Sequence, residues 1–498
     1  MAETLVDLLR ASVARNPQAV ALSHEARALR YADLWDQVVR LARGLIARGL
    51  KPGERVALLM ENSPHYAVAY YGVLAAGGVV AALNTAAKAR DLANWISHCG
   101  ARVLLADTQA RELAALQAAL PSLEVGAVAE TGFAQSAWLA STAGELPALD
   151  VGAPAAIIYT SGTTGNPKGV TLSHANLAHN TRSILAYLEL RAEDSILNVL
   201  PFYYSYGNSV LHTHLAVGAR VVLQNSLAYP HSVLAQMAAE RVSGFAGVPS
   251  TYALLLSRTR LGDYDLSAVR YVTQAGGAMA PAHVQRLQEA LPRVAIFVMY
   301  GQTEATARLT YLPPARLREK LGSAGQAIPG VEIQIKDEQG RALPIGAVGE
   351  VCARGGNIML GYWNDVAATQ KVLRDGWLHT GDLARMDADG FIFIQGRSAD
   401  MIKTGAHRIN PKEVEEVIAE IEGVAEVAVV GAPDEILGQI IKAVVIPRPG
   451  GVLTPRDVQA HCHRQLASYK IPKIIEFAAE LPKTASGKVR RFMLAAHV

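Results

Sequence analysis

Apolar residues between positions 34 and 106 alternate between helical and strand-like spacing. Leu34, Val38, Leu41 and Leu45 fall on one face of a predicted amphipathic helix, and the apolar run 56–60 predicts a buried strand. The same order recurs in segments 64–76 and 79–83, and then in segments 91–98 and 103–106. Repeated alternation of helix and strand is typical of a parallel sheet covered by helices.

The alternation continues beyond Ser173, which is suited to cap a predicted helix extending to Tyr187. Predicted strands follow at 196–200, 218–223, 245–248, 271–274 and 294–299. Apolar runs are closed by Tyr159, Pro201, Val248, Gln274 and Met299. Because ligands of such sheets bind at the carboxyl ends of the strands, we expect the loops after these residues to line one crevice.

The pattern changes twice in the rest of the chain. From residue 331, short strands punctuated by glycine, including 331–335, 348–353 and 391–395, predict a β-rich subdomain. Beyond Arg397 the chain predicts a separate α+β unit, made of helix 411–421, strands 424–430 and 440–446, and helix 455–466. The sequence shows no internal repeat and no low-complexity segment.

Composition narrows the functional classes. The 498 residues include 47 basic and 44 acidic ones, which gives a net charge of +3. Such a small net charge does not indicate binding to nucleic acid or to an anionic membrane. The three cysteines, Cys99, Cys352 and Cys462, are odd in number and far apart, which argues against a disulfide framework and a structural zinc site. Free thiols of this kind are typical of a protein in the reducing cytoplasm.

Residues 66–83 carry no charge and reach the lower length limit of a membrane span. Gly72, Gly77 and Gly78 interrupt this segment, which is better explained by a buried helix followed by a buried strand. Glu3 and Asp7 lie where a signal peptide would have a basic start and an apolar core. We therefore expect neither a membrane span nor a signal peptide.

The segment 159–170, YTSGTTGNPKGV, predicts a phosphate-binding loop after a strand. Its glycines allow a tight turn with inward N–H groups, and its hydroxyls and lysine add further donors. These residues are Gly162, Gly165, Gly169, Ser161, Thr163, Thr164 and Lys168. The loop is not a Walker motif, because Pro167 separates Gly165 from Lys168 and no helix follows directly.

The segment 159–170 and several later motifs together resemble the adenylate-forming superfamily, and in particular its AMP-dependent acyl-CoA synthetase/ligase family. In the order of that family follow YGQTE at 300–304, GEV at 349–351, GYW at 361–363, TGD at 380–382, GR at 396–397 and PKTASGK at 482–488. These motifs span nearly the whole chain.

The resemblance implies an α/β fold. Its large N-terminal domain, 1–397, would contain two helix-covered, mostly parallel sheets in paired subdomains at 1–330 and a β-rich subdomain at 331–397. A small mobile α+β domain, 398–498, would act as a lid that carries the catalytic lysine. The implied activity is an AMP-forming acid–thiol ligase, which uses ATP and Mg²⁺ to adenylate a small to medium aromatic or aliphatic acid and then transfers the acyl group to CoA.

Two alternatives stay open. The adenylate could be delivered to the phosphopantetheine of a separate carrier protein, and the chain could be a non-catalytic adenylate-binding protein. The expected partners are therefore a small carboxylic acid with CoA or a carrier protein, and we allow for a homodimer.

The resemblance also assigns residues. Lys488 would bridge the carboxylate and the α-phosphate during adenylation, Thr303 would contact the α-phosphate, and Glu304 would hold Mg²⁺, which needs few protein carboxylates. Tyr300 would pack on adenine opposite the turn 276–278, Asp382 would accept hydrogen bonds from the ribose hydroxyls, and Arg397 would support ribose and phosphate. The full predicted nucleotide set is Thr160, Ser161, Gly162, Thr163, Thr164, Gly165, Lys168, Gly276, Gly277, Ala278, Tyr300, Gly301, Asp382 and Arg397.

The predicted acyl pocket lies on the loops of the same crevice. Its residues are Tyr203, Tyr204, Tyr206, Asn208, Gly247, Val248 and Gln274. No carboxylate is among them, so an ammonium group would lack a partner, and we expect a neutral acyl or aryl tail rather than an amino acid. His212 and His214 do not share a helix face and are interpreted as packing residues.

The chain departs from the family pattern at two places. Tyr204 stands where many relatives have a histidine beside the acyl carboxylate, and Ala399, followed by Asp400, stands at the usual hinge position. The downstream motif, with Lys403, Gly405 and Arg408, has its glycine one place early. Rotation of the lid between the two half-reactions would therefore use an unusual pivot.

Overall fold

The computed structural model describes residues 3–25, 27–129, 132–133, 138–139, 145–160, 168–397, 400–404, 407–434, 437–450, 453–483 and 489–495. Among these residues, no helix is long and apolar enough to cross a membrane. The uncharged segment 66–83 comprises most of the helix Pro64–Ala75 (α3) and the strand Val79–Ala82 (β4), as predicted. Every residue of α3 except His65 is buried.

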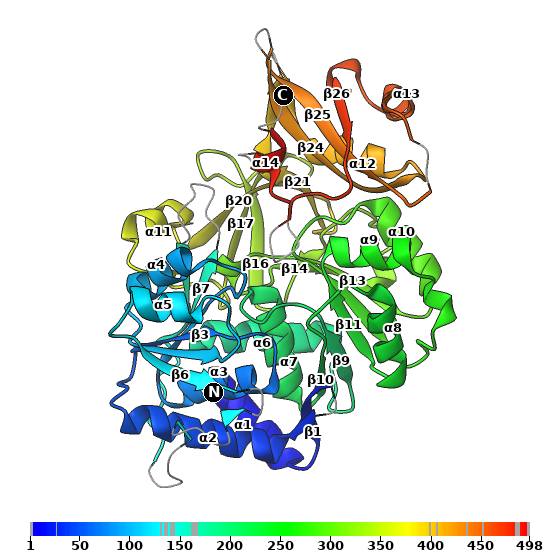
Figure 1. The fold of residues 1–498 in the computed structure, drawn as a ribbon. Coiled ribbons are helices and arrows are strands. Elements are labelled where there is room, and N and C mark those ends of the chain that lie inside the picture. Colours follow the sequence, from blue (N-terminus) through cyan, green and yellow to red (C-terminus); the bar gives the residue numbers. More distant parts are fainter. Residues whose placement is uncertain are drawn as a thin grey trace.

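Two large sheets form the body of the molecule (Figure 1). The nine-stranded sheet consists, in spatial order, of β15 (Gln326–Ala327), β14 (Thr310–Leu312), β13 (Ala295–Tyr300), β12 (Tyr271–Gln274), β11 (Gly244–Gly247), β9 (Ser195–Asn198), β10 (Arg220–Leu223), β1 (Val20–His24) and β2 (Arg27–Arg30). The seven-stranded sheet consists of β18 (Gly361–Tyr362), β8 (Lys168–Ser173), β7 (Pro154–Thr160), β4, β3 (Arg55–Leu59), β5 (Val103–Asp107) and β6 (Glu124–Val128). Their central strands pair in parallel. Antiparallel pairs lie at both edges of the nine-stranded sheet and at one edge of the seven-stranded sheet, whose other edge strand, β6, is parallel to β5.

Helices cover both faces of each sheet and create five layers. Between the sheets lie α1 (Leu5–Arg15), α2 (Tyr31–Ala47), α3, α6 (His174–Leu188) and α7 (Ser205–Val217), which share one hydrophobic core with strands of both sheets. The outer face of the seven-stranded sheet is covered by α4 (Ala89–Cys99) and α5 (Leu113–Ala119). The outer face of the nine-stranded sheet is covered by α8 (Pro230–Ala239), α9 (Pro249–Arg258) and α10 (Pro281–Ala290). The predicted α/β fold class is confirmed.

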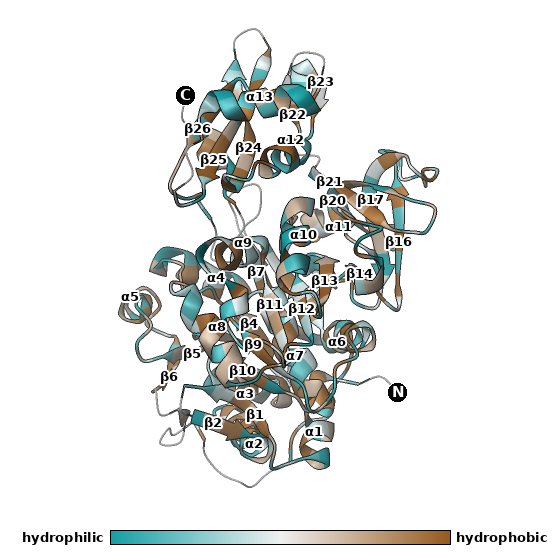
Figure 2. Cartoon of the chain, turned by 90° about the vertical axis from the view of Figure 1, so that its right-hand side faces the viewer, coloured by the Kyte–Doolittle hydropathy of each residue, from teal (hydrophilic) through white to brown (hydrophobic). Residues whose placement is uncertain are grey.

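The sequence pattern explains these layers. Leu34, Val38, Leu41 and Leu45 of α2 are all fully buried, as their helical spacing predicts. Burial of four such side chains contributes roughly 1.5–3 kcal/mol each. Ser173 caps α6 by accepting a hydrogen bond from the Asn176 N–H at 3.0 Å, so this predicted helix start is also confirmed. Figure 2 shows the consequence: central strands such as β9 and β11 are largely hydrophobic, whereas the peripheral helix α13 is largely hydrophilic.

A third, antiparallel sheet follows residue 330. Its strands are β16 (Val331–Lys336), β17 (Val348–Gly355), β20 (Trp377–Met386), β19 (Leu373–Arg374) and β21 (Ile392–Arg397), with α11 (Val366–Val372) beside β20. Short 3-10 turns occur at Leu261–Asp263 (η2), Thr303–Ala305 (η3), Pro314–Arg316 (η4) and Ser468–Lys470 (η6). The β-rich segment predicted from residue 331 is thus present.

The last part of the chain forms a lobe at the top of Figure 1. Its sheet contains β23 (His407–Ile409), β22 (Ile402–Thr404), β25 (Gly438–Pro447), β24 (Val424–Asp434) and β26 (Ile474–Phe477), and its helices are α12 (Pro411–Ala419), α13 (Pro455–Gln465) and α14 (Arg491–Ala495). This lobe has its own hydrophobic clusters. It contacts the body through α12 on α10 and through β24 on α9.

Three buried histidines predict acid sensitivity. Burial lowers the pKa of His212 to about 3 and the pKa values of His174 and His214 to about 4. In the unfolded chain histidine titrates near 6.5, so below that pH the unfolded state binds protons that the folded state excludes. Stability from these groups is therefore complete above about pH 6.5 and falls as the pH drops toward about 4.

We expect the free energy of unfolding of His212→Gln to depend less steeply on pH, by about 1.4 kcal/mol per pH unit over this window. Urea unfolding at pH 7, 6 and 5 measures that slope. A slope equal to that of the wild-type protein would contradict the buried, neutral state of His212.

Candidate active site

The carboxyl ends of β9, β11, β12 and β13 lie at one edge of the nine-stranded sheet, because these strands pair in parallel. Strands β7 and β8 form an antiparallel hairpin in the other sheet, in which Thr160 pairs with Lys168. The predicted phosphate-binding residues Ser161, Gly162, Thr163, Thr164 and Gly165 connect these strands and lie outside the described residues. The Lys168 Nζ atom lies 4.7 Å from the centre of the Tyr362 ring.

Glu304 lies on η3, directly after β13. Its carboxylate accepts a hydrogen bond of 2.8 Å from the Tyr362 hydroxyl, and its backbone oxygen accepts one of 2.9 Å from the Met359 N–H. Burial, and then the adjacent Glu304 charge, raise the pKa of Tyr362, so this phenol remains a donor. The side chain of Glu304 is thus oriented by a neighbour that is 58 residues away in sequence.

Asp382 contacts two other residues of the predicted nucleotide set. Its carboxylate accepts a hydrogen bond of 2.7 Å from the Tyr300 hydroxyl and lies 3.2 Å from Nε of Arg397. Asp382 and Arg397 are also cross-strand partners in β20 and β21. Burial, and then the Asp382 charge, raise the pKa of Tyr300, which keeps its proton as well. The structure therefore gathers Tyr300, Asp382 and Arg397 into one polar group.

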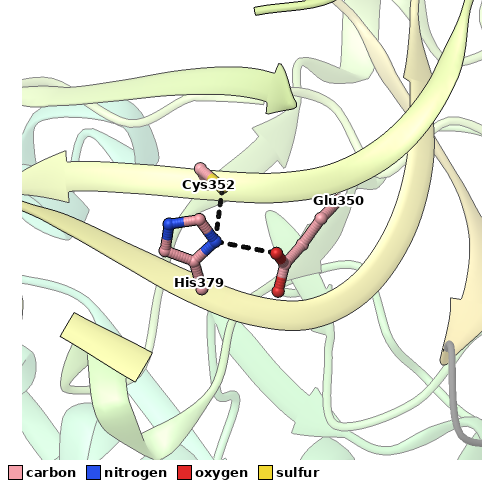
Figure 3. Close-up of side chains that lie close together, drawn as sticks. All are labelled: Glu350, Cys352 and His379. Carbon is pink, nitrogen blue, oxygen red and sulfur yellow. Dashed lines mark hydrogen bonds and ion pairs between the residues drawn. The ribbon is translucent and has the colours of Figure 1, made fainter. Parts of the chain in front are cut away.

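A second group, formed by Glu350, Cys352 and His379, supports the turn that leads to Asp382 (Figure 3). One carboxylate oxygen of Glu350 lies 2.7 Å from Nδ1 of His379, and the other accepts a hydrogen bond of 2.9 Å from the Gly381 N–H. Gly381 has a φ of 74°, which favours glycine at this position. Glu350 thereby fixes the backbone one residue before Asp382.

The Sγ atom of Cys352 lies 3.3 Å from Nδ1 of the cross-strand residue His379. Burial raises the pKa of the Cys352 thiol to about 12. With Glu350, these side chains are a set of donors that suits a soft divalent ion. Their hydrogen bonds to one another already account for the arrangement without an ion.

Thr303 lies beside the start of α7. Its hydroxyl oxygen is 3.2 Å from that of Ser205. Gly301, two residues earlier, packs so tightly that a Cβ atom there would lie 2.1 Å from the Ala307 carbonyl oxygen. The turn from Tyr300 to Glu304 therefore requires this glycine.

The predicted acyl-pocket residues lie on or beside α7, β11 and β12. The Tyr206 hydroxyl lies 2.8 Å from that of Thr273, and the Gln274 amide donates to the Gly277 carbonyl at 2.8 Å. The Tyr204 hydroxyl accepts from the Asn84 amide at 3.2 Å. The ring centres of Tyr203 and Tyr204 lie 4.7 Å apart, Gly247 ends β11, and Val248 directly precedes α9.

Asn208 lies in a polar contact between α7 and α3. Its side-chain oxygen is 3.3 Å from the Tyr70 hydroxyl and 2.8 Å from Nε2 of His212. The other ring nitrogen of His212 lies 3.0 Å from the Tyr71 hydroxyl. The His214 ring bonds to the Tyr271 hydroxyl at 2.7 Å, so both histidines pack in the interior.

The sequence matches two known protein families. Residues 9–363 match the AMP-binding enzyme family, and residues 413–488 match the C-terminal domain of AMP-binding enzymes. The chain belongs to the AMP-binding enzyme family.

Similar proteins of this family include a feruloyl-CoA synthase from Amycolatopsis sp., which is 36% identical over 95% of each chain. An indoleacetate–CoA ligase from Aromatoleum aromaticum is 34% identical over 95% of this chain and 94% of its own. The crystal structure of an anthranilate CoA ligase in complex with anthranoyl-AMP superposes with a TM-score of 0.92 at 28% identity, over 99% of this chain and 96% of the other. The chain is an AMP-forming carboxylic acid–CoA ligase.

The remaining predicted residues of this ligase belong to the start and the end of the C-terminal lobe. Lys488, Ala399 and Gly405 lie outside the described residues. Lys403 and Arg408 pair through their backbones in the hairpin of β22 and β23. Asp400 is exposed at the start of the lobe. The roles of these residues and the domain boundary at Arg397 therefore stay predictions.

The sequence analysis missed four residues at the site. Tyr362 orients Glu304, Ser205 contacts Thr303, and Glu350 holds the turn before Asp382. Tyr362 and Glu350 stand inside the motifs GYW and GEV, but nothing in their spacing shows which distant residue they contact. The fourth, Arg308, stands out in the sequence as a charge within the otherwise uncharged segment 305–312.

Proposed function

We propose that the ligase binds ATP across the crevice, with its ribose at Asp382 and its phosphates between the segment 160–168 and Thr303. The support is the joining of Tyr300, Asp382 and Arg397 in one group, in which the carboxylate faces two fixed donors. A carboxylate can accept hydrogen bonds from both ribose hydroxyls. Since Glu350 and Gly381 fix the backbone, the carboxylate would need little reorganisation on binding.

Glu304 fits a magnesium site. One of its oxygens accepts from Tyr362, and Mg²⁺ is usually bound by one or two protein carboxylates with phosphate oxygens and water. When bound, Mg²⁺ supplies positive charge that offsets the charge developing on the phosphates. Glu304 and Tyr362 would hold the ligand oxygen in place.

The reaction then has two steps. A carboxylate oxygen of the acid attacks the α-phosphorus of ATP, the bond from that phosphorus to the bridging oxygen breaks, and pyrophosphate leaves. Lys488, by family resemblance, places its charge between the carboxylate and the α-phosphate, where negative charge accumulates. The CoA thiol, after losing its proton to the solvent, attacks the acyl carbon, and AMP leaves.

We propose that the acid is small to medium in size, aryl or aliphatic, and lacks an ammonium group. The support for this proposal is the composition of the predicted pocket, in which Tyr203, Tyr204 and Tyr206 offer aromatic rings and no carboxylate is present. An unpaired ammonium would be costly to bury there. The aryl acids named in the relatives, ferulate and indoleacetate, favour the same class.

A panel of acids tests this proposal. Pyrophosphate release is measured with ATP and Mg²⁺ for aryl, short, medium and long-chain acids and for amino acids, each with and without CoA. We expect repeated turnover with small to medium acids only when CoA is present. Turnover confined to amino acids would contradict the proposed substrate class, and release that stops near one equivalent with or without CoA would indicate a carrier protein as the acceptor.

A further inference from the structure

Arg308 is a buried cation without an acidic partner among the described residues. Its residue is only 3% exposed. Its Nε atom lies 3.3 Å from Sδ of Met299, and its Nη1 atom donates to the Ala307 carbonyl at 3.3 Å. The guanidinium carbon lies 4.4 Å from the centre of the Tyr206 ring. Arg308 also interacts with the Tyr187 side chain, but a thioether, a carbonyl and a phenol supply no negative charge to a group with five N–H donors.

Among the described residues, two other lysine or arginine side chains are buried. Lys442, which is 1% exposed, lies 2.9 Å from a carboxylate oxygen of Glu476, whereas Nζ of Lys336, which is 8% exposed, lies 4.0 Å from the centre of the Trp377 ring. A guanidinium retains its charge in proteins, and burying it without an anion is strongly unfavourable. An anion supplied from outside the chain would remove this cost for Arg308.

Arg308 also lines a small cavity between α6, α7 and strands β9 and β12 of the nine-stranded sheet. The cavity is formed by Ile184, Leu188, Ile196, Ser209, Val210, Thr213, His214, Tyr271, Thr273 and Arg308. It has room for about one water molecule. Its wall includes side chains with hydroxyl groups and the imidazole ring of His214. The guanidinium therefore borders a small space that contains polar wall groups.

The face of α7 connects this cavity with the proposed reaction centre. Ser205, Ser209 and Thr213 recur every four residues and so lie on one face of the helix. Ser205 contacts Thr303, whereas Ser209 and Thr213 line the cavity with Arg308. With a rise of 1.5 Å per residue, the cavity begins about 6–12 Å along α7 from the Ser205 end.

We propose that Arg308 binds a second carboxylate at the far end of the acyl substrate, so that the preferred substrates of this ligase are dicarboxylic acids with an aromatic ring or a chain of several methylenes between the two carboxylates. This inference rests on the proposed function, in which the reacting carboxylate lies at Thr303. Tyr206 stands against the guanidinium, so its ring must rotate to admit the spacer between Ser205 and the cavity. An Arg–carboxylate pair in this position would be bidentate and desolvated.

The test compares acids that differ only in the second carboxylate. For the wild-type enzyme we expect kcat/KM to be at least about tenfold higher for terephthalate than for benzoate, or for a straight-chain diacid than for the monoacid of equal length. Arg308→Met should lower kcat/KM for the diacid by about a hundredfold while leaving that for the monoacid and the KM for ATP nearly unchanged. Arg308→Lys should retain part of the preference, since it keeps the charge without the fork of donors.

Unfolding of the same variants separates a binding role from a structural one. Replacing an unpaired buried charge by an apolar side chain of similar volume is commonly neutral or stabilising, so we expect the Tm of ligand-free Arg308→Met to be unchanged or raised. A lowered Tm together with equal losses for diacids and monoacids would overturn the inference. So would a wild-type preference for monoacids. If neither kind of acid releases pyrophosphate, the proposed function itself fails.

Discussion

Lys488→Ala should lower the rate of acyl-adenylate formation by about two to three orders of magnitude, whereas a synthetic acyl-adenylate should still react with CoA. The expected effect is large because negative charge accumulates on the α-phosphate oxygens only in the first step. Removal of a charge that stabilises this transition state leaves the attack of the thiol on the acyl carbon almost untouched. Single-turnover pyrophosphate release measures the first half-reaction, and thioester formation from the synthetic adenylate measures the second.

Lys473→Ala is the matched control for this variant. Lys473 is an exposed residue of the same lobe, and its backbone N–H donates to the Ile441 carbonyl, so removal of its side chain preserves that contact. Both half-reactions should retain wild-type rates in the control. Equal losses of both half-reactions in Lys488→Ala would contradict the role of Lys488 in adenylation.

Glu304→Gln should lower kcat about a hundredfold and raise the Mg²⁺ concentration needed for half-maximal activity. The substitution preserves the size of the side chain and an oxygen that can accept from Tyr362, but it removes the charge that attracts the ion. A titration of activity with Mg²⁺ at saturating ATP and acid measures both effects.

Tyr362→Phe provides a graded comparison. It leaves the carboxylate of Glu304 in place and removes only the hydroxyl that orients it at 2.8 Å. Loss of such an orienting partner commonly weakens metal binding about tenfold, so this variant should fall between the wild-type enzyme and Glu304→Gln. A Mg²⁺ titration that is the same for all three proteins would remove Glu304 from the metal site.

Much of the fold could be predicted because local pattern and tertiary burial agree in this chain. The helical spacing of Leu34, Val38, Leu41 and Leu45 matches α2, and the apolar run at 56–60 matches β3 within one residue at each end. The order of strands in the sheets could not be read in the same way. β1 pairs with β10, about two hundred residues later, and periodicity carries no information on such pairings.

At the site, too, local motifs could be recognised in the sequence but long-range contacts could not. Motifs identified Tyr300, Asp382 and Arg397, and the structure joins them through contacts that span the break between two sheets. The partners that orient these residues, such as Glu350 for the turn before Asp382, are defined by cross-strand register rather than by local sequence. Sequence motifs therefore identify candidate ligand-binding residues more readily than the residues that position them.

Arg308 illustrates a different limit. The sequence analysis favoured a neutral acyl tail because the predicted pocket residues carry no charge, and it did not include Arg308 among them. The cation becomes informative only when its burial, its missing acidic partner and its place beside Tyr206 are known together. Its charge leads us to infer an acidic group at the far end of the substrate, in place of a neutral tail.

The central claim is that the acid attacks the α-phosphorus of ATP. It is tested most directly by following ¹⁸O from a doubly labelled carboxylic acid during turnover with ATP, Mg²⁺ and CoA. Adenylation transfers one labelled oxygen to the phosphate of AMP and leaves the other in the thioester, so mass spectrometry should find one ¹⁸O per AMP and none in pyrophosphate. Label in inorganic phosphate, with ADP as the product, would contradict the account.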